Sequence, residues 1–340
     1  MPSTSAAPGV SVLDSPEQIV RLGNRFSDAK ALLTAVDLDL FGVLQDNPGT
    51  AEEIRTRLDV AGRGLSDLLH LLAALGLLDF EDGRFANTPS AAKYLIRGTD
   101  DYIGGFLLRS DRNLYPAWGK LAEALRTGRP QAVGNFDQVV ADPRLLRQFI
   151  GMMDGLTQVL GPQLVAAYDF ARHRTVLDVG GCRGNLLSKV LGANPGITGT
   201  VFDLPQMEPF FAELMAETGL TGRASFRGGN FFEDPLPTAH LVNLGHVLHD
   251  WDPAQRKELV AKAYAAVEPG GALLVYDRML DDEPAHVENL VISLDMLLVT
   301  DGGSEYPVTE VKEHAAAAGC RDITEQPLGA YDTLVICRKP

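Results

Sequence analysis

The chain has 340 residues, of which 45% are hydrophobic and 22% charged, a composition typical of a globular protein with about two domains. Its formal net charge of −15 at pH 7 argues against a nucleic-acid partner, because affinity for polyanions depends on Lys and Arg side chains. The sequence also lacks the run of about 20 apolar residues that a membrane-spanning helix needs.

The N-terminal segment has neither the basic start nor the apolar run of a secretion signal, so we expect residues 1–14 to form a disordered tail. A chain without such a signal is expected in the cytoplasm, where Cys182, Cys320 and Cys337 would remain reduced thiols. These cysteines lack CxxC spacing, and the sequence therefore predicts neither a metal site nor a disulfide framework.

Residues 15–105 carry helical patterns followed by a short hairpin. Apolar residues at three- and four-residue spacings predict an amphipathic helix over residues 16–44. Thr50 and Glu53 have the spacing of a capping box, which predicts that the helix AEEIRTRL begins there. A second helix, LSDLLHLLAALGLL, precedes a hairpin whose turn is Asp82-Gly83. Two helices followed by a two-stranded wing indicate a winged-helix unit.

The winged-helix pattern raises the hypothesis of DNA binding, which the composition of the second helix can test. Residues 65–78 contain no Lys or Arg, whereas a helix that enters the major groove needs donors for base edges and phosphates. We therefore interpret this helix as a packing element. The apolar surface of the helical half predicts burial against a second copy of the chain, and hence a homodimer.

Residues 106–165 are predicted to form a helical linker that contributes to a substrate pocket, and residues 166–340 a catalytic α/β domain. From residue 172 onward, short apolar strands alternate with helices, the pattern of βαβ units in a mostly parallel sheet. The predicted strands are TVLDVGG, ITGTVFDLP, ASFRGGNFF, AHLVNLGHVLHDW and GGALLVYDRML. The last segments, RDITEQPLGAYDTLVICRK, predict a hairpin that adds one antiparallel strand to the sheet.

A glycine-rich loop, VLDVGGCRG over residues 176–184, joins the first of these strands to a helix, where a ligand can approach the backbone closely. Asp203 ends the second strand, in the place where a carboxylate accepts hydrogen bonds from ribose hydroxyls. The dinucleotide fingerprint G-x-G-x-x-G is absent, because Cys182 and Asn185 occupy two of its glycine positions. The loop therefore indicates a nucleoside site without a pyrophosphate cradle, which suits S-adenosylmethionine (SAM) better than NAD or ATP.

The chain resembles the SAM-dependent O-methyltransferases, whose members include plant caffeic acid O-methyltransferases and bacterial enzymes that methylate polyketides. The resemblance covers nearly the whole chain, residues 18–338, and rests on motifs in the family's order: VLDVGGCRG, FDLP, GGNFF, HVLHDW, GGALLVYD and DGGSEYPVTE. It implies a class I methyltransferase Rossmann-like domain that binds SAM. It further implies that the helical, winged-helix-like N-terminal domain joins two subunits in a dimer.

The resemblance also implies which residues contact the cofactor: Gly180, Asp203, Asn230, Phe231 and Thr157. By similarity, Asn230 and Phe231 flank the adenine, and Thr157 lies near the methionine carboxylate. The family usually has Asp at position 230, but the carbonyl oxygen of Asn can still accept a hydrogen bond. Gly245 is a second departure, because relatives often carry a polar side chain there. We expect both departures to weaken SAM binding without changing the identity of the cofactor.

Methyl transfer to a phenol benefits from a base, because a phenol has a pKa of about 10. His249 lies at the end of the fourth predicted strand, at the edge where a doubly wound sheet binds ligands, and the resemblance implies that it is this base. The resemblance also places Glu305 and Asp277 beside the imidazole. Glu305 is the expected orienting group, since Asp277 is shorter than the Glu that relatives commonly have. His246 is interpreted as structural, and Asp250 either contacts substrate or caps the next helix.

An aromatic acceptor is expected between soft apolar side chains, and Met153 and Met296 match family positions with that role. Thr300 and Arg109 are the candidates for polar contacts with it. The sequence thus predicts an enzyme that methylates a hydroxyl of a small aromatic molecule without a metal. A composition rich in Arg, Ala and Gly is typical of a GC-rich bacterial genome, which suggests natural-product biosynthesis, including that of antibiotics.

Three alternatives remain open at this point. Some proteins of this fold keep SAM but catalyse pericyclic, decarboxylation or hydroxylation steps, and others methylate an aromatic amine. A winged-helix regulator that senses SAM is the third. The presence of His249 and Glu305 argues against the first alternative, and the acidic charge argues against the third.

Overall fold

A computed structural model of the protein describes residues 13–99, 101–132, 136–280 and 286–340. The chain divides into two compact units, one formed by residues up to 116 with 147–158, the other by residues 117–146 with 159–340. The domain boundaries predicted after residues 14, 105 and 165 stay predictions, and most of the predicted tail lies outside the described residues. Among the described residues, no helix is both long and apolar enough to cross a membrane.

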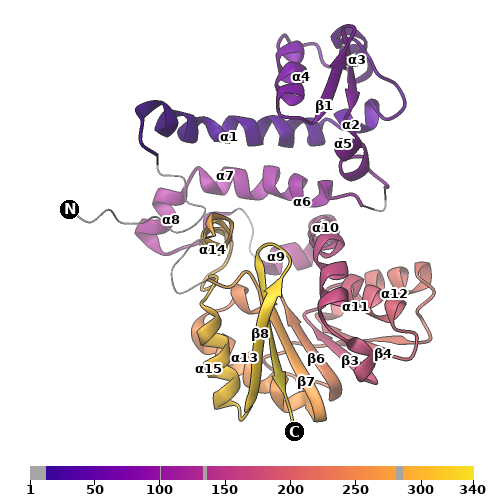
Figure 1. The fold of residues 1–340 in the computed structure, drawn as a ribbon, viewed down its shortest axis with the longest axis vertical. Coiled ribbons are helices and arrows are strands. Elements are labelled where there is room, and N and C mark those ends of the chain that lie inside the picture. The colour runs from indigo at the N-terminus through magenta and orange to yellow at the C-terminus, as the bar shows by residue number, and fades with distance from the viewer. Residues whose placement is uncertain (1–12, 100, 133–135, 281–285) are drawn as a thin grey trace. The chain divides into compact units, whose positions relative to one another are not determined.

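The first unit consists of helices and one β-hairpin (Figure 1). Its elements in chain order are α1 (Pro16–Asp37), α2 (Leu40–Val43), α3 (Ala51–Arg57), α4 (Leu65–Ala74), β1 (Leu78–Glu81), β2 (Arg84–Asn87), α5 (Pro89–Tyr94), α6 (Gly104–Arg109) and the π-helical turn η1 (Ser110–Leu114). The helix predicted over 16–44 is interrupted at Asp39, whose left-handed φ of 56° redirects the chain. The redirected segment buries Leu40 and Phe41 in the core of this unit. The predicted hairpin is confirmed, because Asp82 and Gly83 have the positive φ values of a type I′ turn, 49° and 77°.

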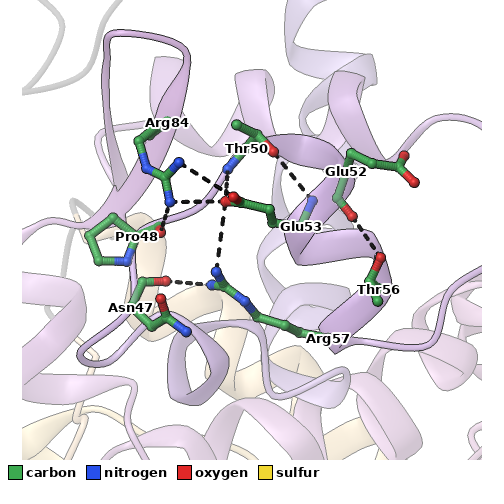
Figure 2. Close-up of polar contacts among 8 residues, drawn as sticks. All are labelled: Asn47, Pro48, Thr50, Glu52, Glu53, Thr56, Arg57 and Arg84. Atoms are coloured by element: carbon green, nitrogen blue, oxygen red, sulfur yellow. Dashed lines mark hydrogen bonds and ion pairs between the residues drawn. The ribbon is translucent and has the colours of Figure 1, made fainter.

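The start of α3 is set by local sequence (Figure 2). The Thr50 hydroxyl accepts a hydrogen bond from the Glu53 N–H at 3.3 Å, and the Glu53 carboxylate accepts from the Thr50 N–H at 2.9 Å. The predicted capping box is therefore confirmed. Arg84 of the hairpin donates to the same Glu53 carboxylate at 2.9 Å and to the Pro48 carbonyl at 2.7 Å. These bonds fasten the hairpin to α3.

The second unit holds the remaining elements. They are α8 (Leu121–Thr127), α9 (Phe136–Ala141), η2 (Phe170–Arg172), β3 (Thr175–Val179), α11 (Asn185–Ala193), β4 (Thr198–Asp203), η3 (Pro205–Met207), α12 (Glu208–Glu217), β5 (Ala224–Gly228), β6 (Ala239–Gly245), η4 (Leu248–Asp250), α13 (Pro253–Ala266), β7 (Val267–Asp277), α14 (Val287–Val299), α15 (Val308–Ala317), β8 (Asp322–Leu328) and β9 (Asp332–Arg338). Two helices, α7 (Tyr115–Trp118) and α10 (Pro143–Ala167), contribute residues to both units.

One sheet organises the second unit. Its described strands pair in the order β5-β4-β3-β6-β7-β9-β8, and the pairs from β5 to β7 are parallel. Strand β9 runs antiparallel to both β7 and β8. The predicted mostly parallel sheet with an antiparallel C-terminal strand is therefore confirmed. It agrees with the Rossmann-like catalytic domain that the resemblance implies.

Helices cover both faces of this sheet, because successive strand residues point to opposite sides. On β7, Leu273 and Val275 face a core shared with α13 and α15, whereas Leu274 and Tyr276 face a core shared with α10, α11 and α12. All four side chains are buried. Burial on both faces explains why the central strands β3, β6 and β7 contain continuous apolar runs in the sequence.

Candidate active site

The carboxyl ends of the parallel strands meet at one edge of the sheet, and several predicted site residues follow those ends. Strand β3 ends at Val179, immediately before the glycine loop, and β4 ends at Asp203 itself. Strand β6 ends at Gly245, so the prediction that this strand extends to His249 is wrong, and His249 follows four residues later in a turn. Strand β7 ends at Asp277. The strand order thus gathers residues that are far apart in the sequence.

The glycine loop between β3 and α11 passes through backbone conformations that few side chains tolerate. Gly180 has a φ of 71°, and a Cβ added to it would lie 2.7 Å from Val247 Cγ2. A Cβ on Gly181 would lie 2.6 Å from Asp178 Oδ2. Cys182 also has a positive φ, 50°, although it carries a side chain. At Gly180 and Gly181 the loop therefore leaves bare backbone at the edge of the sheet, as the close approach of a nucleoside requires.

Asp203 is bonded to this loop. Its Oδ2 accepts a hydrogen bond from the Cys182 N–H and its Oδ1 accepts one from the Leu204 N–H, both at 2.7 Å. Burial raises the pKa of the Asp203 carboxyl to about 6, against the lowering effect of these two donors. Each carboxylate oxygen can accept a second bond, so Asp203 retains lone pairs for the two hydroxyls of a ribose.

The segment after β5 is arranged by its own polar groups. Asn230 Oδ1 accepts from the Phe232 N–H at 3.0 Å, and the Asn230 N–H donates to Asp234 Oδ2 at 2.9 Å. The carbonyl oxygen expected to accept from adenine is thus already engaged with the backbone. Phe231 packs edge to face against Trp251, with ring centroids 5.7 Å apart. The adenine contacts of Asn230 and Phe231 stay predictions.

The three residues predicted for catalysis converge in the second unit. His249 lies in the 3-10 turn η4, and its Nδ1 is 2.8 Å from Glu305 Oε1 and 3.7 Å from Asp277 Oδ1. Because an ionised carboxylate only accepts, Nδ1 carries the proton of the bond to Glu305, and Nε2 is the nitrogen left to bind a further proton. Nε2 lies 3.9 Å from Asp250 Oδ1. The side chains of His249, Asp277 and Glu305 are all buried.

Burial and charge oppose each other in this cluster. Burial disfavours a charge on His249, but Glu305, Asp277 and Asp250 outweigh it and raise the pKa of the imidazole to about 10. Burial raises the pKa of the Asp277 carboxyl to about 7, although the neighbouring His249 lowers it. The surrounding carboxylates thus favour the imidazolium, the form that His249 reaches once it has accepted a proton.

Sequence reasoning missed a fourth member of the cluster, Tyr306. Its hydroxyl donates a hydrogen bond to Asp277 Oδ2, and the residue is buried. A buried tyrosine is often a packing residue whose hydroxyl finds a single polar partner, and no local motif distinguishes this one. Only its contact with Asp277 in space identifies it.

The turn before Glu305 is held against the η4 segment. Thr300 Oγ1 donates to the Met296 carbonyl and accepts from the Gly303 N–H, each at 2.8 Å. A Cβ on Gly303 would lie 2.4 Å from the His249 carbonyl oxygen. The missing side chain at position 303 therefore allows Glu305 to reach the imidazole. Because the Thr300 hydroxyl is engaged in this turn, its contact with substrate stays a prediction.

Gly303→Ala is expected to push Glu305 away from His249. The clash is with a backbone oxygen that cannot rotate aside, so we expect a loss of about 1–3 kcal/mol in the free energy of unfolding and roughly tenfold lower activity. Thermal unfolding and initial rates measure the two effects. Gly302→Ala is the matched control, because its Cβ would meet Asp252 Cβ at 3.1 Å, a contact that a small shift relieves. Equal losses in the two variants would contradict this account.

Asp252 and His246, which lie on either side of His249 in the sequence, each have a structural partner. The cap of α13 is Asp252, whose Oδ1 accepts from the N–H groups of Ala254 and Gln255 at 2.8 and 2.9 Å. Asp250 is therefore not the cap, and its contact with substrate stays a prediction. His246 Nε2 lies 2.7 Å from Asp332 Oδ1.

Four of the predicted site residues lie on helices of the two units. Met153 and Thr157 are on the part of α10 that belongs to the first unit, and Arg109 ends α6 in the same unit. The Thr157 hydroxyl donates to the Met153 carbonyl at 2.8 Å and keeps its own lone pairs as acceptors. Met296 is buried on α14 of the second unit. Their contacts with cofactor and acceptor stay predictions.

Among the described residues, His246, His249 and Asp277 offer ligand atoms within 4.8 Å of one another, a spacing that could hold a metal ion. His249 Nδ1 already has Glu305 as its partner, and His246 Nε2 has Asp332. One nitrogen of each imidazole thus already lies beside a carboxylate. The expectation that no metal takes part stays a prediction.

Comparison with known proteins finds relatives that span the chain. It matches a family model described as an O-methyltransferase domain over residues 118–321 and one described as an O-methyltransferase dimerisation domain over residues 20–97. It is 41% identical to the tetracenomycin polyketide synthesis 8-O-methyl transferase TcmO of Streptomyces glaucescens, over 96% of this chain and 97% of that protein. Identity to the N,N-dimethyltransferase OxyT of Streptomyces rimosus is 36%, over 95% of this chain and 96% of that one. Human N-acetylserotonin methyltransferase in complex with SAM has a TM-score of 0.88 at 27% identity, over 97% of this chain and 99% of that chain.

Proposed function

The chain belongs to the O-methyltransferase family and is a SAM-dependent enzyme of that family, and on this basis we propose that it methylates a phenolic hydroxyl of an aromatic small molecule, with His249 as general base. The observation that carries the proposal is the bond of 2.8 Å between His249 Nδ1 and the buried Glu305, at the carboxyl edge of the sheet. Similarity to TcmO, whose name places it in polyketide synthesis, supports natural-product biosynthesis as the setting.

SAM supplies a methyl group already activated on a sulfonium, so the proposed reaction needs no metal. The residues proposed to hold it are Gly180, Asp203, Asn230, Phe231 and Thr157. The bare backbone of the glycine loop and the free lone pairs of Asp203 support this assignment. The carbonyl oxygen of Asn230 accepts one backbone hydrogen bond and carries no charge, which supports a weaker adenine contact than the Asp that is usual in the family.

In the proposed reaction, His249 removes the proton of the acceptor hydroxyl, and Glu305 orients His249. Glu305 accepts the Nδ1–H of His249, which fixes the tautomer and leaves Nε2 to take the proton of a hydroxyl. A phenol of pKa about 10 is mostly protonated at neutral pH, so removing its proton as the new bond forms lowers the barrier. The resulting imidazolium is stabilised by the carboxylates of Glu305 and Asp277.

From the family resemblance, we propose that Met153 and Met296 are apolar contacts of the acceptor, and that Asp250, Thr300 and Arg109 are candidates for its polar contacts. We also propose a homodimer formed through the N-terminal domain. The match to a dimerisation domain supports it, as do four apolar side chains of α1 that are more than half exposed: Ile19, Val20, Leu22 and Phe26. The acidic charge supports the absence of a nucleic-acid partner.

An aromatic amine is the second candidate for the acceptor. It is favoured by the 36% identity to OxyT, whose name describes an N,N-dimethyltransferase. A neutral amine attacks through its lone pair without prior loss of a proton, so N-methylation would make His249 dispensable. The bond between His249 and Glu305 supports the hydroxyl acceptor instead.

The test is a mass-spectrometric assay of the wild-type protein with SAM and a panel of phenols, each paired with the corresponding aniline. We expect a product heavier by one CH2 unit from a phenol and none from its aniline. Methylation of the anilines alone would replace the proposal with N-methyl transfer, and conversion of an acceptor without methylation would point to repurposed chemistry. If no product forms, calorimetry with S-adenosylhomocysteine shows whether the protein fails to bind the cofactor or whether the panel lacks a suitable acceptor.

A further inference from the structure

We propose that Tyr306 is a positioning residue for the catalytic cluster, which it serves by holding the Asp277 carboxylate in its ionised form with one oxygen turned toward His249. This inference rests on the proposed function, because it concerns the proton balance of the proposed base. Neither the family match nor the sequence motifs assign a role to Tyr306.

The two carboxylate oxygens of Asp277 have different neighbours. Oδ2 accepts the hydrogen bond from the Tyr306 hydroxyl. Oδ1 lies 3.7 Å from His249 Nδ1 and has no hydrogen-bond partner among the described residues. Tyr306 therefore turns the carboxylate so that its second oxygen faces the imidazole. The contact is electrostatic, since 3.7 Å is too long for a good hydrogen bond.

The direction of the bond follows from the burial of the phenol. Burial raises the pKa of Tyr306 well above its ordinary value, and Asp277 raises it further. The raised pKa favours the protonated phenol, which is the form that donates to Asp277. A donor of this kind favours the ionised form of the carboxylate that accepts from it.

The ring of Tyr306 is itself held in place by α13. The Arg256 guanidinium carbon lies 4.8 Å from the centroid of the Tyr306 ring, a cation–π contact. Arg256 is fixed in turn, because its Nε donates to Glu310 Oε1 at 2.7 Å and its Nη1 donates to the Trp251 carbonyl at 2.6 Å. Both side chains are buried, and the fixed guanidinium packs against the ring whose hydroxyl bonds to Asp277.

The charged and titratable groups around Asp277 and His249 come from several elements. They are Glu305 and Tyr306 before α15, His246 before η4, Asp250 at the end of η4, Asp332 of β9 beside His246, and Arg256 of α13 against Tyr306. Of these, Tyr306 is the group that donates a hydrogen bond to Asp277. Burial raises the pKa of the Asp277 carboxyl, and without the Tyr306 hydrogen bond less would oppose this effect.

Loss of the Tyr306 hydroxyl is expected to raise the pKa of Asp277 and lower that of His249. Burial raises the pKa of Asp277 to about 7 and the Tyr306 hydrogen bond opposes that rise, so removing the donor should raise the pKa further and favour the protonated carboxyl. The cluster then loses one negative charge, the imidazolium of His249 loses a stabilising neighbour, and the pKa of His249 falls. A tyrosine that only fills space would leave that pKa unchanged.

The experiment is Tyr306→Phe in the full-length protein, with the pKa of His249 read from the imidazole nitrogen shifts of protein labelled with 15N-histidine. We expect a downward shift of at least half a pH unit, and a kcat lowered about tenfold with KM within about twofold. In the Asp277→Asn background the same substitution should add no further shift, because the charge through which Tyr306 acts is gone. Tyr264→Phe is the matched control, since it removes another buried tyrosine hydroxyl outside the cluster.

A second readout needs no change at position 306. In the wild type, the Tyr306 hydroxyl proton should appear as a slowly exchanging downfield resonance that titrates together with Asp277. An unshifted His249 in folded Tyr306→Phe, or an equal shift in the Asp277→Asn background, would overturn the proposal. If His249→Ala kept full activity, His249 would not be the base, yet the His249 titration would still decide the role of Tyr306.

Discussion

His249→Ala is expected to lower kcat for a phenolic acceptor at neutral pH by between about 100-fold and 10,000-fold, the usual contribution of a general base. The binding of S-adenosylhomocysteine should change by less than about threefold, because the glycine loop and Asp203 stay intact. The loss should shrink as the pH approaches the phenol pKa of about 10, since a phenolate needs no base. Initial rates over a pH series measure both effects.

His70→Ala is the control for this experiment. His70 is exposed on α4 of the first unit and takes no part in the cluster, so its removal should leave kcat unchanged. A His249→Ala enzyme that kept its rate at neutral pH would show that alignment of acceptor and cofactor alone carries the reaction. The methyltransferase assignment would survive that outcome, but the role of His249 would not.

Asp203→Ala is expected to weaken the binding of S-adenosylhomocysteine by roughly 100-fold or more. A hydrogen bond to a charged group contributes about 1.5–3 kcal/mol, and the carboxylate is proposed to accept two from the ribose. The change also removes the acceptor for the Cys182 and Leu204 N–H groups, which hold the glycine loop in place. Isothermal titration calorimetry with S-adenosylhomocysteine measures the affinity without turnover.

Glu217→Ala removes an exposed carboxylate at the end of α12 and serves as the control for charge alone. Its affinity for S-adenosylhomocysteine should match that of the wild type. If Asp203→Ala also bound within about threefold of the wild type, the ribose would have to be held by other groups. The proposed cofactor site would then need to be placed elsewhere on the sheet.

The features that could be predicted from the sequence are those that depend on neighbours along the chain. The capping box at Thr50 and the turn at Asp82-Gly83 need only residues within a few positions of each other. The same holds for the strand ends that carry Asp203 and Asp277. The convergence of Glu305 on His249 was expected only through the family resemblance, because 56 residues separate them.

By itself, the sequence determined the alternation of strands and helices, and with it the edge of the sheet at which the proposed site lies. Only the tertiary structure decided that Asp39 interrupts the first helix, that Tyr306 bonds to Asp277 and that Gly303 packs against the His249 carbonyl. The physical reason is the separation along the chain over which each kind of interaction acts. Periodicity and turn preferences act between residues close in the sequence, whereas these contacts depend on how a whole unit packs around its core.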